Sequence, residues 1–170
     1  MKNLKGTKTE QNLKDAFAGE SQANRRYLAF AKKADQEGHA TVAKLFRAAA
    51  AAETVHALNH FRALGGIQDT SKNLETAIAG ENYEVVTMYP EFIANAEAEG
   101  EKKALTSFQW AFEVEQEHYE LFKEALEKLG EETADIEIWV CASCGHTHVG
   151  IPPEKCPVCG APKNKFDKIE

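Results

Sequence analysis

The stretch "AAAAAETVHALNH", residues 48–60, decides the fold of this chain. Five alanines lead into Glu53, and no glycine or proline interrupts the run, which predicts one continuous helix. Residues three and four positions apart form one apolar face of this helix, and Glu53 and His56 lie on that face. A carboxylate and an imidazole are costly to bury, so their place on the apolar face of this helix requires an explanation.

The composition limits the kind of protein. The chain has 170 residues, 43% of them hydrophobic, which is enough for one four-helix core and a small additional domain. Its net charge of −7 argues against nucleic-acid binding, because nucleic-acid binders are usually basic. It has no apolar run near the roughly 20 residues of a membrane span and no apolar N-terminal signal segment. We expect neither a nucleic-acid nor a membrane partner, and a cytoplasmic location in which thiols stay reduced.

Hydrophobic periodicity predicts a mainly α protein with four helices, at about residues 8–38, 41–64, 74–100 and 102–129. Thr7 and Glu10 fit a capping box before the first helix. Pro90 should kink the third, because proline removes one backbone hydrogen bond. Short connections predict a four-helix bundle. Residues 18–27, "AGESQANRRY", resemble residues 79–89, "AGENYEVVTMY", so the chain reads as two copies of a helical hairpin.

Each predicted helix carries a glutamate in the middle of its apolar stripe. Two of these open Glu-x-x-His pairs and one opens a Glu-x-x-Glu pair, and residues three apart project from the same side of a helix. One glutamate from each of two helices plus Glu-x-x-His from each of the other two is the di-iron carboxylate pattern. The seven candidate ligands are Glu20, Glu53, His56, Glu81, Glu84, Glu115 and His118.

A simpler interpretation, solvated or salt-bridged glutamates, suits any one of these residues taken alone. It fails for the set, because five carboxylates in one seam repel each other and each is costly to desolvate. Iron or manganese suits such ligands, and Glu53 and Glu115 are the best candidates to bridge two metal ions. His60 lies one turn further on and is expected to pack beside the ligands. Tyr27 and Tyr89 are either core aromatics or phenols that hydrogen-bond ligand carboxylates.

The C-terminal 36 residues contain all four cysteines, and glycine and proline become frequent there. This segment includes a short strand candidate, "IWV", at residues 138–140, before the first cysteine. The cysteines form two Cys-x-x-Cys-Gly knuckles, which predict a tetrahedral metal site of four thiolates: Cys141, Cys144, Cys156 and Cys159. Zinc would make the site structural, whereas iron would make it a one-electron carrier. Four sulfurs complete the shell, so His146 and His148, between the knuckles, are expected on the surface.

The whole pattern resembles rubrerythrin. The motifs that carry the resemblance are "ETVH" at 53–56, "ENYE" at 81–84, "MYPEF" at 88–92, "EQEH" at 115–118 and the two knuckles. Glu84 is the specific mark, because the first repeat has Ala23 at the equivalent position. The resemblance implies a ferritin-like four-helix bundle over residues 1–134 and a small β-rich, rubredoxin-like metal domain over residues 135–170. The family often has an aromatic residue where this chain has His146.

The resemblance also implies a function. It implies a non-haem peroxidase that reduces hydrogen peroxide to water in oxidative stress defence. Two iron ions would occupy the carboxylate site, and one iron, with zinc as the alternative, the four-cysteine site. Electrons would come from a rubredoxin or an NAD(P)H-dependent reductase. One iron would move between Glu84 and His56 as its redox state changes.

A homodimer is expected, in which the tail of one subunit approaches the di-iron site of the other; whether it exchanges helices stays open. Two alternatives remain from the residues: a ferroxidase or iron-storage protein, and a dioxygen-consuming oxidase with a zinc tail.

Overall fold

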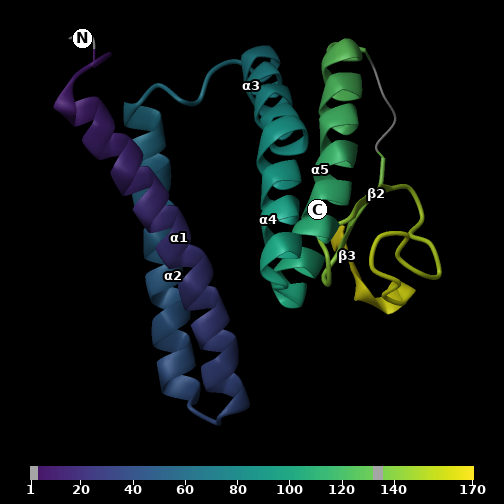
Figure 1. Cartoon of the computed structure of the whole chain (residues 1–170). Coiled ribbons are helices and arrows are strands. Elements are labelled where there is room, and N and C mark those ends of the chain that lie inside the picture. Colours follow the sequence, from purple (N-terminus) through teal and green to yellow (C-terminus); the bar gives the residue numbers. More distant parts are fainter. Residues whose placement is uncertain (1–3, 132–135) are drawn as a thin grey trace. The chain divides into compact units, whose positions relative to one another are not determined.

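A computed structural model describes residues 4–131 and 136–170 of the chain. The chain divides into two compact units, residues 1–68 and 69–170. Figure 1 shows helices in both units and a small sheet in the second. No described helix combines the length and the apolar character that a membrane crossing requires.

The first unit is a hairpin of two long helices, α1 (Lys8–Gln36) and α2 (Ala40–Ala63). Half of the predicted capping box is present: the Thr7 hydroxyl accepts from the Glu10 N–H at 3.1 Å, but the Glu10 carboxylate accepts from the Gly6 N–H at 2.6 Å, one residue before the N-cap. Asn24 on α1 donates to the carbonyl of Ala50 on α2 at 2.7 Å. Small side chains fill the interface and let the two helices approach closely, namely Ala31, Ala34, Ala43, Ala50 and Ala57.

In the second unit, the third predicted helix consists of three segments, α3 (Thr70–Tyr83), a π-helical turn η1 (Glu84–Met88) and α4 (Tyr89–Glu99). It begins four residues before the predicted start, because the Asp69 side chain caps it by accepting from the Lys72 N–H at 3.0 Å. The expected interruption at Pro90 takes the form of the π turn, in which the Tyr89 N–H donates to the Glu84 carbonyl.

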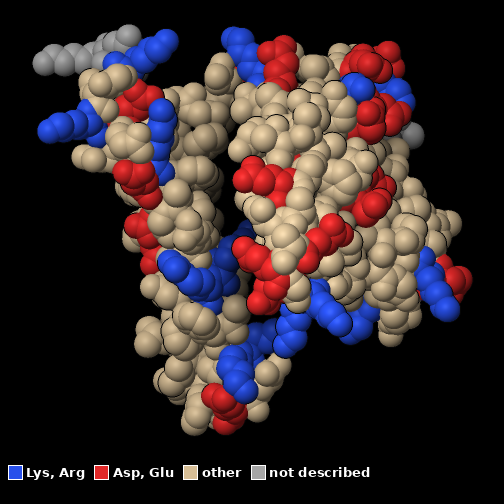
Figure 2. Space-filling view, in the orientation of Figure 1, with Lys and Arg blue, Asp and Glu red and all other residues tan. Residues whose placement is uncertain are grey.

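The last long helix, α5 (Lys102–Glu127), follows a turn at Gly100, whose φ of 73° lies in the left-handed region that glycine favours. It packs against α3 and α4. Figure 2 shows acidic side chains gathered over the face that α3 and α4 present in this view, in keeping with the net charge of −7. The expectation of a mainly α chain with four helices is confirmed.

The C-terminal segment forms a small ribbon around the cysteines. Its strands are β1 (Ile138–Cys141), β2 (Thr147–Val149) and β3 (Phe166–Ile169), with a short 3-10 turn, η2 (Lys163–Lys165), before β3. They form an antiparallel sheet in the order β2-β1-β3. Its core consists of Cys141, Cys156 and Phe166, which confirms the small β-rich metal domain. The predicted boundary between residues 134 and 135 lies outside the described residues, so that division of the chain stays a prediction.

Candidate metal centres

The first hairpin brings together Glu20 from α1 with Glu53 and His56 from α2. One ligand atom of each lies within 4.8 Å of the others, a separation that one metal ion can span. Glu53 Oε2 lies 3.0 Å from His56 Nδ1. The side chain of His56 is 53% exposed and that of Glu53 is 17% exposed. Within this hairpin the histidine therefore faces solvent, and the carboxylates are more enclosed.

The two carboxylates of this cluster shift each other's pKa values in opposite directions. The hydrogen bond to Glu53 raises the pKa of Glu20, and burial adds to this effect. The same bond, together with the one to His56, lowers the pKa of Glu53. A cation held by these converging ligand atoms would relieve the repulsion between the two carboxylates, so the donor set fits a metal ion.

The second unit builds a matching cluster from Glu81 on α3 and from Glu115 and His118 on α5. Their ligand atoms also lie within 4.8 Å of one another. His118 Nδ1 lies 2.7 Å from Glu115 Oε2, and this hydrogen bond raises the pKa of His118. Burial raises the pKa of Glu81 to about 7, and the charge of Glu115 contributes to that shift. These carboxylates resist ionising together, which again fits a site that a cation completes.

Glu84 lies at the edge of this second cluster, as the first residue of the π turn. Burial raises the pKa of its carboxyl, and the charge of Glu115 acts in the same direction. It is not one of the three residues whose ligand atoms converge. π-helical turns recur at functional sites, so its position agrees with a ligand that binds in only some states.

The two tyrosines and His60 lie around the clusters. Tyr27 packs against Phe30 and Phe46, with its ring centroid 6.1 Å from that of Phe46. Tyr89 packs edge-on against Phe92, at 6.3 Å. Burial raises the pKa of the Tyr89 phenol, and the Glu84 charge is the next cause. The aromatic packing is therefore confirmed, and a hydrogen bond to a ligand carboxylate stays a prediction.

His60 is absent from the first cluster but close enough for its charge to lower the pKa of Glu20.

The four cysteines converge in the ribbon with their sulfur atoms within 4.8 Å of one another. Cys141 and Cys159 Sγ are 3.8 Å apart, and Cys144 and Cys156 Sγ are 3.6 Å apart. A tetrahedral ion with metal–sulfur bonds of about 2.3 Å separates its ligands by about 3.8 Å, so the spacing fits a metal site of four thiolates.

Backbone N–H groups point at the sulfurs. The N–H groups of Ser143 and Cys144 donate to the Cys141 sulfur. The N–H of His146 donates to Cys144, and the N–H of Ala161 donates to Cys159. Burial raises the pKa of the Cys141 thiol, but these donors and the neighbouring sulfurs outweigh it and leave the pKa at about 7. Burial raises the pKa values of the Cys144 and Cys159 thiols, so a metal ion would be needed to hold all four sulfurs as thiolates.

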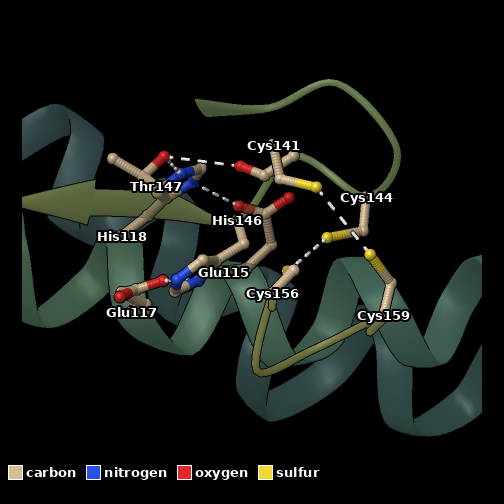
Figure 3. A network of polar contacts seen from close by, with 10 residues as sticks. Glu115, Glu117, His118, Cys141, Cys144, His146, Thr147, Cys156 and Cys159 are labelled. Atoms are coloured by element: carbon tan, nitrogen blue, oxygen red, sulfur yellow. Dashed lines mark hydrogen bonds and ion pairs between the residues drawn. The ribbon is translucent and has the colours of Figure 1, made fainter. Parts of the chain in front are cut away.

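The expectation that His146 lies on the surface is wrong. His146 is only 5% exposed, and its Nδ1 lies 2.6 Å from Oε2 of Glu117 on α5 (Figure 3). His148 is half-buried, and its Nε2 lies 3.0 Å from the Ile151 carbonyl oxygen. His146 is buried between Glu117 on α5 and the ring of Phe166, and His148 packs against Phe166 within the ribbon.

The sequence motifs do not point to Thr147, which contacts a candidate metal ligand. Its hydroxyl lies 2.8 Å from His118 Nε2, and the two residues are separated by 29 positions in the sequence. The motifs carry no sign of this pairing, because a threonine in a short strand has many ordinary roles.

Two carboxylate–histidine clusters on helices, with a separate four-cysteine ribbon, match the residue pattern of the di-iron carboxylate class of proteins. A family model described as Rubrerythrin matches residues 11–126, and one described as Rubrerythrin, rubredoxin-like domain matches residues 139–167. The chain belongs to the rubrerythrin family.

Relatives match along nearly the whole chain. Rubrerythrin-1 of Clostridium acetobutylicum is 35% identical, covering 98% of this chain and 97% of its own length. Rubrerythrin of Nitratidesulfovibrio vulgaris is 35% identical over 99% of this chain and 98% of its own. A solved structure of fully reduced, all-ferrous nigerythrin matches with a TM-score of 0.58 and 34% identity, over 96% of this chain and 87% of that one.

Membership of the rubrerythrin family identifies the type of cofactor. Rubrerythrins bind iron in a di-iron site and in a rubredoxin-like site of four cysteines, and this chain has clusters of residues for both. Members of the family are generally oxidoreductases.

Proposed function

We propose that this protein is a peroxidase that reduces hydrogen peroxide to water. Each turnover takes two electrons and two protons, breaks the O–O bond and releases two water molecules. One observation carries the proposal: the four-cysteine ribbon and the Glu81, Glu115 and His118 cluster belong to one compact unit, with β2 in contact with α5. A one-electron carrier beside a carboxylate–histidine cluster suits a redox enzyme and has no use in iron storage.

We propose that the seven helical candidates are ligands to the iron ions. When bound, the two iron ions would supply the two electrons that peroxide accepts. Glu53 and Glu115 would hold the iron together with Glu84, whose harder carboxylate suits the ferric state, and His56, whose imidazole suits the ferrous state. Tyr27 and Tyr89 would orient ligand carboxylates. The complete set is Glu20, Glu53, His56, Glu81, Glu84, Glu115 and His118.

The four-cysteine site would receive electrons one at a time through Cys141, Cys144, Cys156 and Cys159. Family members generally use rubredoxin-type donors. We propose a rubredoxin or an NAD(P)H-dependent reductase as the donor here, a cytoplasmic location and a homodimeric assembly. Reduction of peroxide with electrons from this donor would protect the cell against oxidative stress.

A coupled assay tests this function. Iron-loaded protein is mixed with NADH, a reductase and a rubredoxin, and NADH oxidation is followed after hydrogen peroxide is added. We expect about one NADH oxidised per peroxide, together with a small oligomer in size-exclusion chromatography. Rapid oxidation of added ferrous iron by a large cage, without peroxide-dependent NADH oxidation, would instead establish a ferroxidase.

A further inference from the structure

The ring of His118 lies between two hydrogen-bonding partners from different parts of the second unit. Its Nδ1 lies 2.7 Å from Glu115 Oε2, and its Nε2 lies 2.8 Å from the Thr147 hydroxyl oxygen (Figure 3). The Thr147 hydroxyl in turn donates to the Gly145 carbonyl, at 3.4 Å. Both ring nitrogens of His118 are therefore engaged, one by α5 itself and the other by β2 of the ribbon.

These contacts have a direction that suits metal binding. A histidine that ligates a metal through Nδ1 must carry its remaining ring proton on Nε2, and that N–H needs an acceptor. The Thr147 oxygen can accept this proton because its own hydrogen is directed to Gly145. A hydroxyl can do both at once, whereas a valine of the same shape can do neither.

The position of Thr147 also connects the two metal centres within one chain. Thr147 follows His146, whose backbone N–H donates to the Cys144 sulfur. The His146 side chain lies against Glu117, the residue before His118. Two neighbouring residues of the ribbon thus contact two neighbouring residues of α5, and this pairing fixes the Thr147 hydroxyl opposite the ring of His118.

We propose that Thr147 is a positioning residue for His118. Its hydroxyl oxygen accepts a hydrogen bond from His118 Nε2–H and so holds the ring with Nδ1 toward Glu115 and Glu81. The same contact joins the four-cysteine ribbon to the carboxylate–histidine cluster of the same chain. The inference rests on the proposed function only in taking His118 as a metal ligand. The hydrogen bond itself is a property of the metal-free chain.

The test uses the full-length chain and three variants. Thr147→Val removes the hydroxyl and keeps the shape of the side chain, while Thr147→Ser keeps the hydroxyl. Thr106→Val is the matched control, because Thr106 also lies in the second unit but its hydroxyl donates to the Lys102 carbonyl within α5. Circular dichroism first establishes that each variant keeps its helices.

The first readout is ¹⁵N NMR of the histidine side chains in chain whose helical clusters are free of metal. We expect a ¹⁵N shift that reports a hydrogen bond between His118 Nε2 and the hydroxyl of residue 147 in the parent, Thr147→Ser and Thr106→Val, and the loss of that shift in Thr147→Val. The second readout is titration with cobalt(II) as the probe, with zinc already in the four-cysteine site. Thr147→Val should bind cobalt about 10-fold more weakly, since partners of ligating histidines typically change affinity by this factor or more.

Unchanged His118 signals and unchanged cobalt affinity in Thr147→Val would overturn the inference. Failure of the proposed function would look different, because the parent would then reduce no peroxide while the His118 signals still responded to Thr147→Val.

Discussion

The raised pKa of Glu81 leads to a prediction about stability when the helical clusters hold no metal. Burial and the charge of Glu115 raise this pKa to about 7 from the ordinary 4.5. Between these values the folded chain keeps a proton that the unfolded chain has lost, so the free energy of unfolding falls as the pH rises. The stabilisation of the folded chain by this proton is complete below pH 4.5 and is lost by about pH 7.

The size of the effect follows from the two pKa values. At about 1.4 kcal/mol per pH unit, the full difference corresponds to about 3.4 kcal/mol. Glu81 is only half-buried, so water screens part of the interaction, and we expect about 1–2 kcal/mol. Glu81→Gln keeps the shape of the side chain but cannot ionise. It should therefore stabilise the chain by about 1–2 kcal/mol at pH 8 and by much less at pH 5.

Urea denaturation followed by helical circular dichroism measures this difference, after a chelator has removed metal from the helical clusters. Glu75→Gln is the control, because Glu75 is an exposed residue on the same helix, α3. The control should show the same pH dependence as the parent. The reasoning about the carboxylate cluster is refuted if the free energy of unfolding changes by the same amount between pH 5 and pH 8 in Glu81→Gln and in the parent.

Three further changes probe other parts of the account. Glu84→Ala should keep the helices and slow peroxide turnover about 10-fold or more, whereas Glu91→Ala, at an exposed position on α4, should leave the rate unchanged; a normal rate in Glu84→Ala would contradict the role proposed for Glu84. Cys156→Ser should abolish the visible ferric–thiolate band and the reductase-driven turnover together, and retention of both would exclude Cys156 as a ligand. Ala43→Leu should cost about 1–3 kcal/mol by overpacking the hairpin interface, where Ala43 is fully buried, while Ala48→Leu at an exposed position should cost little in the same thermal melt.

Much of the fold and of the metal clusters could be predicted because the determining geometry is local. Residues three apart on a helix share a face, so the pairs Glu53 with His56 and Glu115 with His118 follow from sequence spacing alone. The Cys-x-x-Cys-Gly knuckles are equally local, and their sulfurs converge as the pattern predicts.

Features that depend on packing between distant segments could not be predicted. The burial of His146 follows from the contact of β2 with α5, which no periodicity encodes. Four cysteine sulfurs are enough to fill a metal shell, but a histidine that is not a ligand can still be buried by packing, as His146 is. The early start of α3 was missed for a simpler reason: Asp69 lies in a polar stretch that reads as loop, although its side chain caps the helix.

The π turn shows an intermediate case. Pro90 predicts an interruption, but the sequence does not say how the helix accommodates it. The chain inserts a π-helical turn that begins at Glu84, so the extra glutamate lies at the irregular turn.

The most direct test of the central claim follows electrons through both metal centres. The iron-loaded protein is fully reduced without oxygen, and stoichiometric hydrogen peroxide is added while the ferric–thiolate band is recorded, with dioxygen in a parallel run. For a peroxidase with both metal sites connected, the band should return fast with peroxide and slowly with dioxygen. Faster return with dioxygen would contradict the peroxidase assignment, and a protein that shows no such band would contradict iron in the four-cysteine site.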